Sequence, residues 1–274
     1  MPEGIEIELY RQAALAAVGR TIASVDAPDA WFLKRGLTAP VLTDALVGRR
    51  LVAARRRGKL LLLDTSDGGP VLGLRFGMTG RLVVDGRQGI EELEYGSSRD
   101  LATWDRFVLA FTGGGQLRLN DPRRLGGVEL DPDEAMLGVD AFAIKPRELA
   151  HALAGSTAPL KARLMDQGRI AGIGNLLADE ILWQARVHPA TPGDELTRPQ
   201  AKRLLAASRE AVAAALRDGG VHTLTIIAHR HPDGRCPRDG ALMTHGTIAG
   251  RTTWWCPAEQ RRRRPGTGRP SRSS

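Results

Sequence analysis

The chain of 274 residues is 42% hydrophobic, which is enough for one large or two modest domains with substantial apolar cores. No apolar run approaches the ~20 residues of a membrane span, and the N-terminus carries acidic residues where a signal peptide would carry basic ones, so we expect a cytoplasmic protein. The formal net charge of +8 indicates nucleic acid as a partner, but six of the arginines lie in residues 261–274, where there is no acidic residue. This segment, rich in Pro, Gly and Ser, predicts a disordered basic tail that either adds weak phosphate affinity or has no role.

Outside the tail, the placement of the basic residues is more informative than their number. They stand in short clusters at expected turns, namely residues 55–59, residues 123–124 and Arg163. Basic side chains grouped in this way favour phosphate binding.

The first half of the chain predicts a helix followed by a β-sheet structure. Apolar residues at helical spacing predict a helix over residues 5–18, ended by Gly19. Short apolar or alternating runs then predict strands, separated by Gly- and Asp-rich turns at residues 67–69 and 112–115. The predicted strands cover residues 59–64, 71–74, 81–84, 107–111 and 116–119. This pattern is typical of a β-sandwich or barrel.

The second half predicts helices. The strand pattern stops near residues 131–133, and Ala- and Leu-rich segments follow at residues 146–153, 160–166, 175–184 and 199–216. Glu180 and Trp183 are expected in the helical core. After Gly219 and Gly220, residues 229–259 are rich in Gly, Pro, His and Cys and predict a small module with a β-hairpin.

The N-terminus offers an unusual nucleophile. If Met1 is removed, the Pro2 nitrogen becomes a terminal amine with a pKa near ~8, against ~10.4 for a lysine side chain, so more of it is unprotonated at neutral pH. Because this amine is secondary, its attack on an aldehyde-level carbon gives an iminium, and Glu3, with Glu6 as a second candidate, could move the protons. The structural alternative is that Pro followed by Glu simply opens a helix.

A second motif lies between two predicted helices. Two glycines and an asparagine, Gly172, Gly174 and Asn175, predict a turn where backbone N–H groups can approach a phosphate closely. Together with the segments at residues 2–6, 56–59, 76–80, 120–124 and 164–180, and with Arg251 five residues before Cys256, the chain resembles the formamidopyrimidine-DNA glycosylase and endonuclease VIII family of base-excision repair enzymes. The resemblance runs nearly end to end.

The resemblance implies an α+β fold: an N-terminal β-sandwich with a leading helix, a helix-two-turn-helix domain and a C-terminal zinc-finger-like β-hairpin. The expected divisions are residues 1–133, 134–224, 225–260 and the tail at 261–274. It also implies a protein that binds damaged double-stranded DNA in the bacterial cytoplasm, at the nucleoid. Because no sequence feature indicates an obligate oligomer, we expect a monomer.

The resemblance further implies the chemistry. Pro2 attacks the sugar C1′ of a damaged nucleotide, Glu3 donates and relays protons, and the iminium allows strand cleavage by β- and then δ-elimination. The damaged base must first be flipped out of the stack. Lys59 is assigned to the catalytic group, where it is also the amine that could replace Pro2 as nucleophile.

Three residues match the family's wedge, which fills the gap left by the flipped base. They are Met78, Arg123 and Leu125. Without the resemblance, Met78 in its Gly-rich turn would be interpreted as a packing residue.

Four residues match the family's phosphate contacts, which set backbone affinity and salt dependence rather than sequence preference. They are Lys59, Lys161, Asn175 and Arg251. On sequence alone, Lys59 would be a solvated charge and Asn175 a helix cap.

The last module departs from the family. Its zinc ribbon uses four cysteines, whereas here Cys236 and Cys256 keep that spacing and Asp239 and Glu259 replace the other two. Because structural zinc prefers thiolate and imidazole ligands, zinc binding is doubtful. A modified zinc site completed by His231 or His245 and a metal-free hairpin held by Trp254 and Trp255 both remain open. A disulfide between the two cysteines is disfavoured in a reducing cytoplasm.

Other departures concern the substrate. Ile5 replaces a proline, the wedge carries Leu125 in place of phenylalanine, and the segment after residue 216 is short, so a loop that covers a flipped 8-oxoguanine is not expected. These features favour oxidised pyrimidines, ring-opened purines or bulkier lesions. The alternatives to a bifunctional glycosylase are a monofunctional or lesion-specialised one and a damaged-DNA-binding protein without turnover.

Overall fold

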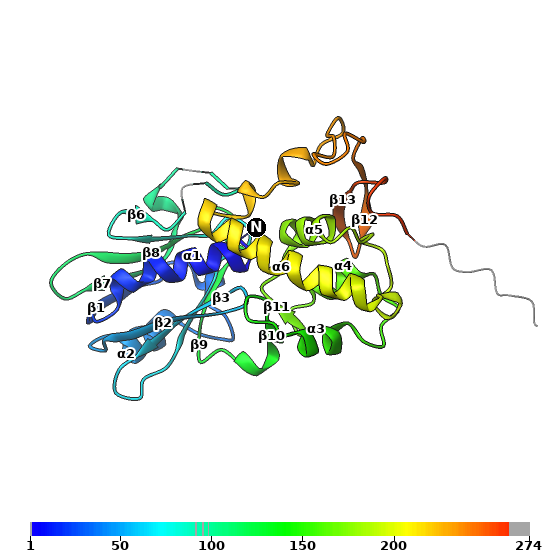
Figure 1. Ribbon diagram of the computed structural model, residues 1–274. Coiled ribbons are helices and arrows are strands. Elements are labelled where there is room, and N and C mark those ends of the chain that lie inside the picture. Colours follow the sequence, from blue (N-terminus) through cyan, green and yellow to red (C-terminus); the bar gives the residue numbers. More distant parts are fainter. Residues whose placement is uncertain (1, 91, 95, 98, 263–274) are drawn as a thin grey trace, which may run out of the picture.

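The protein divides into a β-rich half and a helical half with a C-terminal hairpin (Figure 1). This computed structural model describes residues 2–90, 92–94, 96–97 and 99–262, so most of the predicted basic tail lies outside the described residues. The longer helices are α1 (Gly4–Ala14), α2 (Ala39–Leu46), α3 (Pro146–Leu153), α4 (Leu160–Met165), α5 (Asn175–Gln184) and α6 (Arg198–Asp218). Within the described residues, none of the helices is long and apolar enough to cross a bilayer.

Two antiparallel sheets form the β-sandwich predicted for the first half. The five-stranded sheet has the order β1-β7-β8-β5-β6, and the four-stranded sheet has the order β2-β3-β4-β9. Alternate residues Phe107, Leu109 and Phe111 of β7 are buried, as expected for a strand with one face on a core. The strands are β1 (Ile22–Asp26), β2 (Leu51–Arg57), β3 (Leu60–Thr65), β4 (Leu72–Arg75), β5 (Arg81–Val84), β6 (Arg87–Gln88), β7 (Asp105–Phe111), β8 (Gln116–Asn120) and β9 (Gly127–Leu130).

The first basic cluster, expected at a turn, is divided: Arg55, Arg56 and Arg57 end strand β2, and only Gly58 and Lys59 form the turn that follows. Arg56 forms ion pairs with Asp140 at 2.7 Å and with Glu8 at 3.2 Å, and Arg55 pairs with Asp64 at 2.7 Å. These charges therefore stabilise the protein internally. Arg163 is likewise buried and donates to the carbonyl oxygen of Ala152 at 2.7 Å.

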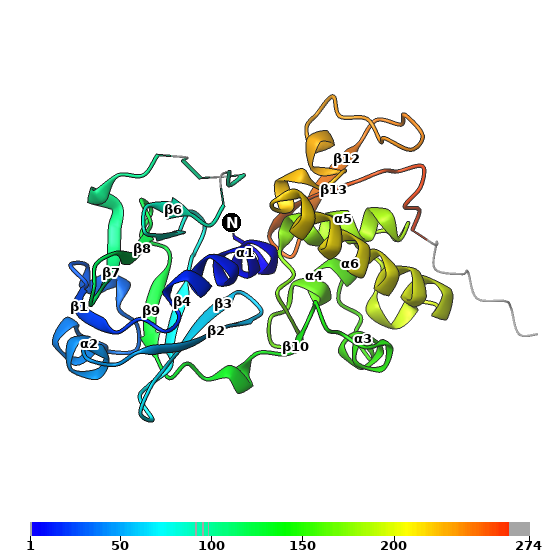
Figure 2. The same ribbon diagram turned by 60° about the vertical axis from the view of Figure 1, so that its left-hand side comes forward.

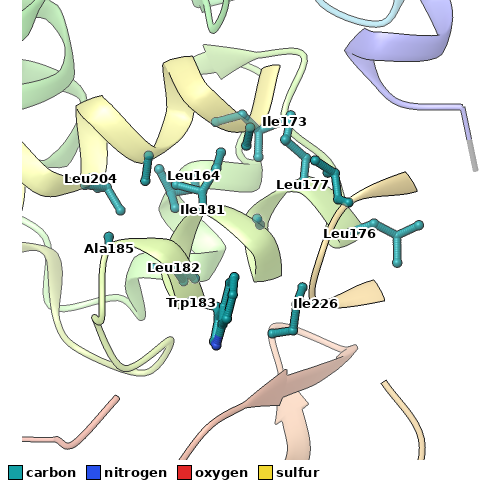
Figure 3. Close-up of a cluster of buried hydrophobic side chains, with 14 of the residues drawn as sticks. Leu164, Ile173, Leu176, Leu177, Ile181, Leu182, Trp183, Ala185, Leu204 and Ile226 are labelled. Atoms are coloured by element: carbon teal, nitrogen blue, oxygen red, sulfur yellow. The ribbon is translucent and has the colours of Figure 1, made fainter. Parts of the chain in front are cut away.

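The helical half encloses the second core (Figure 3). Leu177 and Ile181 of α5 and Leu204 of α6 pack in it, and Glu180 and Trp183 are buried on α5 as predicted. A short parallel pair, β10 (Val139–Asp140) and β11 (Ile170–Ala171), leads into it.

Helix α1 joins the two halves (Figure 2). Ile5 belongs to the helical core, whereas Ile7 and Tyr10 belong to the sandwich core. The Gly4 N–H donates to the carbonyl oxygen of Gly172 at 2.8 Å, and a Cβ on Gly4 would lie 2.9 Å from that same oxygen. The start of the chain is therefore fixed at the junction. The helix is shorter than predicted, since it ends at Ala14 and is followed by a 3-10 turn.

The last module is the predicted β-hairpin, formed by β12 (Thr244–Ile248) and β13 (Arg251–Trp255). Trp254 packs in the helical core. The ring of Trp255 lies edge-on to the ring of His188, with 5.1 Å between the two ring centres. The buried Gln260 accepts from the Cys256 N–H and donates to the Val187 carbonyl oxygen, each at 2.9 Å. Packing and hydrogen bonds thus attach the hairpin to the helical half.

Candidate nucleic-acid interface and active site

The buried carboxylate of Glu3 is bound by the N-terminus of helix α5. It is 1% exposed and accepts hydrogen bonds from the N–H groups of Gly174 at 2.9 Å, Leu176 at 2.8 Å and Leu177 at 3.1 Å. A Cβ on Gly174 would overlap the Glu3 side chain, so only glycine fits there. The Gly-x-Gly-Asn turn predicted to approach a phosphate therefore holds a carboxylate of the protein itself. Pro2, one residue earlier, is buried at the same junction.

A second carboxyl group, Glu6, lies next to Glu3. It accepts from the Glu3 N–H at 2.7 Å and from the Val221 N–H at 2.8 Å. Burial, followed by the charge of Glu3, raises the pKa of Glu6 to about 7. Glu6 can therefore exchange a proton near neutral pH beside the start of the chain.

Lys59 experiences the charges of this same site. Burial lowers its pKa, Glu3 and Glu6 oppose that shift, and Arg251 adds to it. The turn that carries Lys59 is pressed against the Gly-rich turn, because a Cβ on Gly58 would lie 2.7 Å from the Ala171 side chain. The structure thus brings Lys59, Glu3 and Arg251 into one electrostatic environment.

The predicted wedge residues are held by Asp121, whose role the sequence did not reveal. This fully buried carboxylate accepts from the Thr79 hydroxyl at 2.7 Å, from the Arg123 N–H at 3.1 Å and from the Leu125 N–H at 2.9 Å. Arg123 and Leu125 are exposed on the resulting loop. The turn of Met78 lies against them, since a Cβ on Gly77 would overlap the Leu125 backbone.

A cavity of about 480 Å³ collects three of the predicted DNA-binding residues. Its lining includes Met78, Asn175 and Arg251, together with Arg230, Thr252 and Trp254. Among the described residues, the buried Oδ1 of Asn175 has no hydrogen-bond partner. The cavity lies where α5, the hairpin and the Met78 turn meet. A polar ligand bound in it would therefore contact both halves of the protein.

Lys161 does not reach this surface, contrary to the expectation of a direct phosphate contact. Its side chain is fully buried and pairs with Asp179 at 2.6 Å, and its Nζ donates to the Thr253 hydroxyl at 2.9 Å. Asp179 also pairs with Arg230 at 3.1 Å and accepts from the Trp254 N–H at 3.2 Å. Lys161 therefore positions the strand that carries Arg251.

The last module offers three metal ligands rather than four. Ligand atoms of Cys236, Asp239 and Cys256 lie within 4.8 Å of one another. Glu259, the fourth residue at the expected spacing, instead pairs with Arg186 at 2.9 Å and Arg238 at 3.2 Å. The described residues therefore do not fit a closed four-ligand zinc site.

The two sulfur atoms also have other polar partners. The Trp183 Nε1–H donates to Cys236 Sγ at 3.4 Å, and Cys256 Sγ lies 3.3 Å from Asp239. Burial raises the pKa of the Cys256 thiol to about 11. Neither cysteine is in a disulfide.

Comparisons with known proteins match both halves of the chain to one family. Residues 1–128 match the family model of the formamidopyrimidine-DNA glycosylase N-terminal domain, and residues 137–226 match that of the formamidopyrimidine-DNA glycosylase H2TH domain. Proteins named formamidopyrimidine-DNA glycosylase from a Nocardioides species and from Chloroflexus aurantiacus are each 34% identical. The alignments cover 98% of both chains in the first case, and 95% of this chain and 98% of the relative in the second.

Two solved structures show the same fold. One is MutM in complex with DNA containing carbocyclic 8-oxo-G, with 25% identity and a TM-score of 0.80 over 95% of this chain and 100% of that one. The other is Lactococcus lactis Fpg (MutM) with DNA containing FAPY-dG, with 25% identity and a TM-score of 0.79 over 94% and 99% of the two chains.

Proposed function

Since this chain belongs to the formamidopyrimidine-DNA glycosylase family, we propose that it is a bifunctional DNA glycosylase that uses Pro2 as its nucleophile. It would excise damaged bases from double-stranded DNA and cleave the resulting abasic site. The observation that carries this proposal is the buried Glu3 carboxylate, held directly beside Pro2 by three backbone N–H groups at the N-terminus of α5.

In the proposed reaction, the free Pro2 nitrogen forms a bond to C1′ as the bond from C1′ to the base breaks, and the electron pair leaves with the base, which takes a proton from water. The Glu3 carboxylate takes the proton of the Pro2 nitrogen and passes it to O4′ as the sugar ring opens, leaving an iminium between Pro2 and C1′. The iminium acidifies the C2′ proton, whose removal expels the 3′ phosphate in β-elimination. δ-Elimination then expels the 5′ phosphate.

We assign the DNA contacts to residues on both sides of the junction. Met78, Arg123 and Leu125 would fill the space left by the flipped base, and Lys59, Asn175 and Arg251 would bind backbone phosphates. With Leu125 in the wedge, we favour oxidised pyrimidines, ring-opened purines or bulky lesions as substrates. The protein would act as a monomer at the bacterial nucleoid.

The test of this function is borohydride trapping on a duplex with one abasic site, using protein shown by mass spectrometry to begin at Pro2. We expect a covalent adduct that maps to Pro2. No adduct here, together with base release from a second duplex that carries a damaged base, would indicate a monofunctional glycosylase. Tight binding without either product would indicate a damage-binding protein.

Replacement of Arg251 by alanine should weaken DNA binding about equally for all sequences. Because Arg251 is exposed beside the Asn175 cavity and would neutralise one phosphate, the slope of log K against log salt should fall by about one. Fluorescence anisotropy at several salt concentrations measures this slope. The control is Arg209→Ala, an exposed arginine of α6 outside the cavity. A slope equal to that of the wild type would remove the hairpin from the interface.

We also propose that the hairpin is stable without zinc, because Glu259 is engaged by two arginines and Gln260 ties the strand end to the helical half. Elemental analysis should give far less than one zinc per chain, and a chelator should leave the melting temperature and DNA affinity unchanged. A different result would contradict this proposal: one zinc per chain, with a lower melting temperature or a lower DNA affinity after its removal. It would show that Cys236, Asp239 and Cys256 form a structural metal site.

A further inference from the structure

A large aromatic side chain is exposed beside the wedge loop, the segment that carries the predicted wedge residues Arg123 and Leu125. Trp31 is 70% exposed, and Leu125 on the neighbouring segment is 49% exposed. The two segments run side by side: Asp29 pairs with Arg124 through contacts of 2.5 and 2.7 Å, and the Lys34 N–H donates to the Val128 carbonyl oxygen at 2.9 Å. Contiguous exposed apolar patches mark binding surfaces, and these two side chains lie on adjacent segments.

Trp31 is presented by a well-fixed backbone. Its N–H donates to Asp29 Oδ1 at 3.1 Å, and its carbonyl oxygen accepts from Lys34 Nζ at 2.8 Å. The next residue, Phe32, is fully buried, and its ring packs closely against Gly126, where an added Cβ would lie only 2.9 Å from the ring. Little backbone entropy would therefore be lost when a ligand stacks on the indole.

The surroundings of Trp31 are basic. Lys34 Nζ lies 5.5 Å from the centre of the indole ring, and the exposed Arg123 has no ion pair among the described residues. Arg35 and Arg124 are close by on the same two segments, each paired with one carboxylate. An exposed aromatic ring among cations is the arrangement by which proteins bind unstacked nucleobases.

We propose that Trp31 is a DNA contact that stacks on a base of the undamaged strand, next to the gap that Leu125 enters. The inference rests on the proposed function, because it requires the wedge loop to face DNA. Leucine offers no aromatic face to the base opposite the lesion, and Trp31 supplies one from the neighbouring segment. Trp31 would therefore contribute to affinity and to the preference for the opposite base.

The test uses a duplex with a tetrahydrofuran abasic analogue and 2-aminopurine opposite it. Trp31→Ala should weaken binding about tenfold and reduce the change in 2-aminopurine fluorescence, whereas Trp31→Phe should stay within about threefold of the wild type. Met136→Ala is the matched control, since Met136 is 71% exposed on a different segment, and it should change neither quantity. All variants should melt at the wild-type temperature, because neither side chain is buried.

The outcomes separate this inference from the proposed function. Unchanged affinity and fluorescence in Trp31→Ala would overturn the Trp31 contact, even if the wild type is trapped through Pro2. Trp31-dependent binding without any trapped adduct would keep the contact and reject the lyase activity. If the wild type does not bind the lesion duplex at all, both proposals are wrong.

Discussion

Protein that keeps extra residues ahead of Pro2 is expected to give no borohydride-trapped adduct with abasic DNA. An amide nitrogen cannot form the iminium, so blocking the chain end removes the nucleophile and leaves the rest of the site in place. Trapping should fall at least a thousandfold, while binding to a tetrahydrofuran duplex should fall by less than about tenfold. Gel analysis of the trapped complex and anisotropy of the same samples measure the two quantities. Pro2→Gly should also lose most trapping, because the unrestricted glycine backbone no longer fixes the terminal amine in position.

Lys59 is the rival amine in this experiment. Burial lowers the pKa of its side chain, so more of it is neutral at pH 7 than for an ordinary lysine. The matched variant is therefore Lys59→Met with a free Pro2, for which we expect an adduct at Pro2 and weaker binding. If the blocked chain is still trapped and Lys59→Met is not, Lys59 is the nucleophile and the assignment to Pro2 is wrong.

The fold could be predicted wherever one pattern dominated the local sequence. Strand β5 and helices α3 and α5 match their predicted bounds, because alternation or helical spacing continues up to clear turn residues. Strand β2 was missed because three of its seven residues are arginines, and the carboxylates that pair with them, Asp64 on the neighbouring strand and Asp140 on a distant segment, become visible only in the fold. Helix α2 was missed because eight residues hold a single buried pair, Leu42 and Leu46, one turn apart.

The site could be predicted only in part, because residue type does not fix a side chain's surroundings. The Pro-Glu start and the Gly-rich turn were recognised separately, but that the turn holds Glu3 depends on contacts across more than 170 residues. Lys161 was expected at the surface, since nothing local shows that Asp179 shares its buried position. Asp121 lies within the motif at residues 120–124, but its four backbone and side-chain donors become visible only in the folded loop.

Replacement of Glu3 by glutamine is expected to separate base excision from abasic-site cleavage. The amide keeps the shape of the side chain but cannot donate a proton as an acid, so excision of a damaged base should fall by about a hundredfold or more. Cleavage of a preformed abasic site should fall by less than about tenfold, because an abasic sugar opens to its aldehyde in solution and needs no proton from Glu3 at O4′. Single-turnover assays on the two substrates measure both rates.

A loss of structure must be distinguished from this loss of chemistry. The three N–H groups around Glu3 all need acceptors, and the amide NH₂ group can only donate, so Glu3→Gln should lower the free energy of unfolding by about 1–3 kcal/mol. Lower stability would reduce the rates of both reactions alike, whereas loss of the acid would reduce the rate of base excision alone. Glu8→Gln on the same helix is the matched control, because Glu8 pairs with Arg11 and Arg56 and lies outside the carboxylate site. Equal losses on the two substrates in Glu3→Gln would mean that Glu3 holds the junction together but is not the acid.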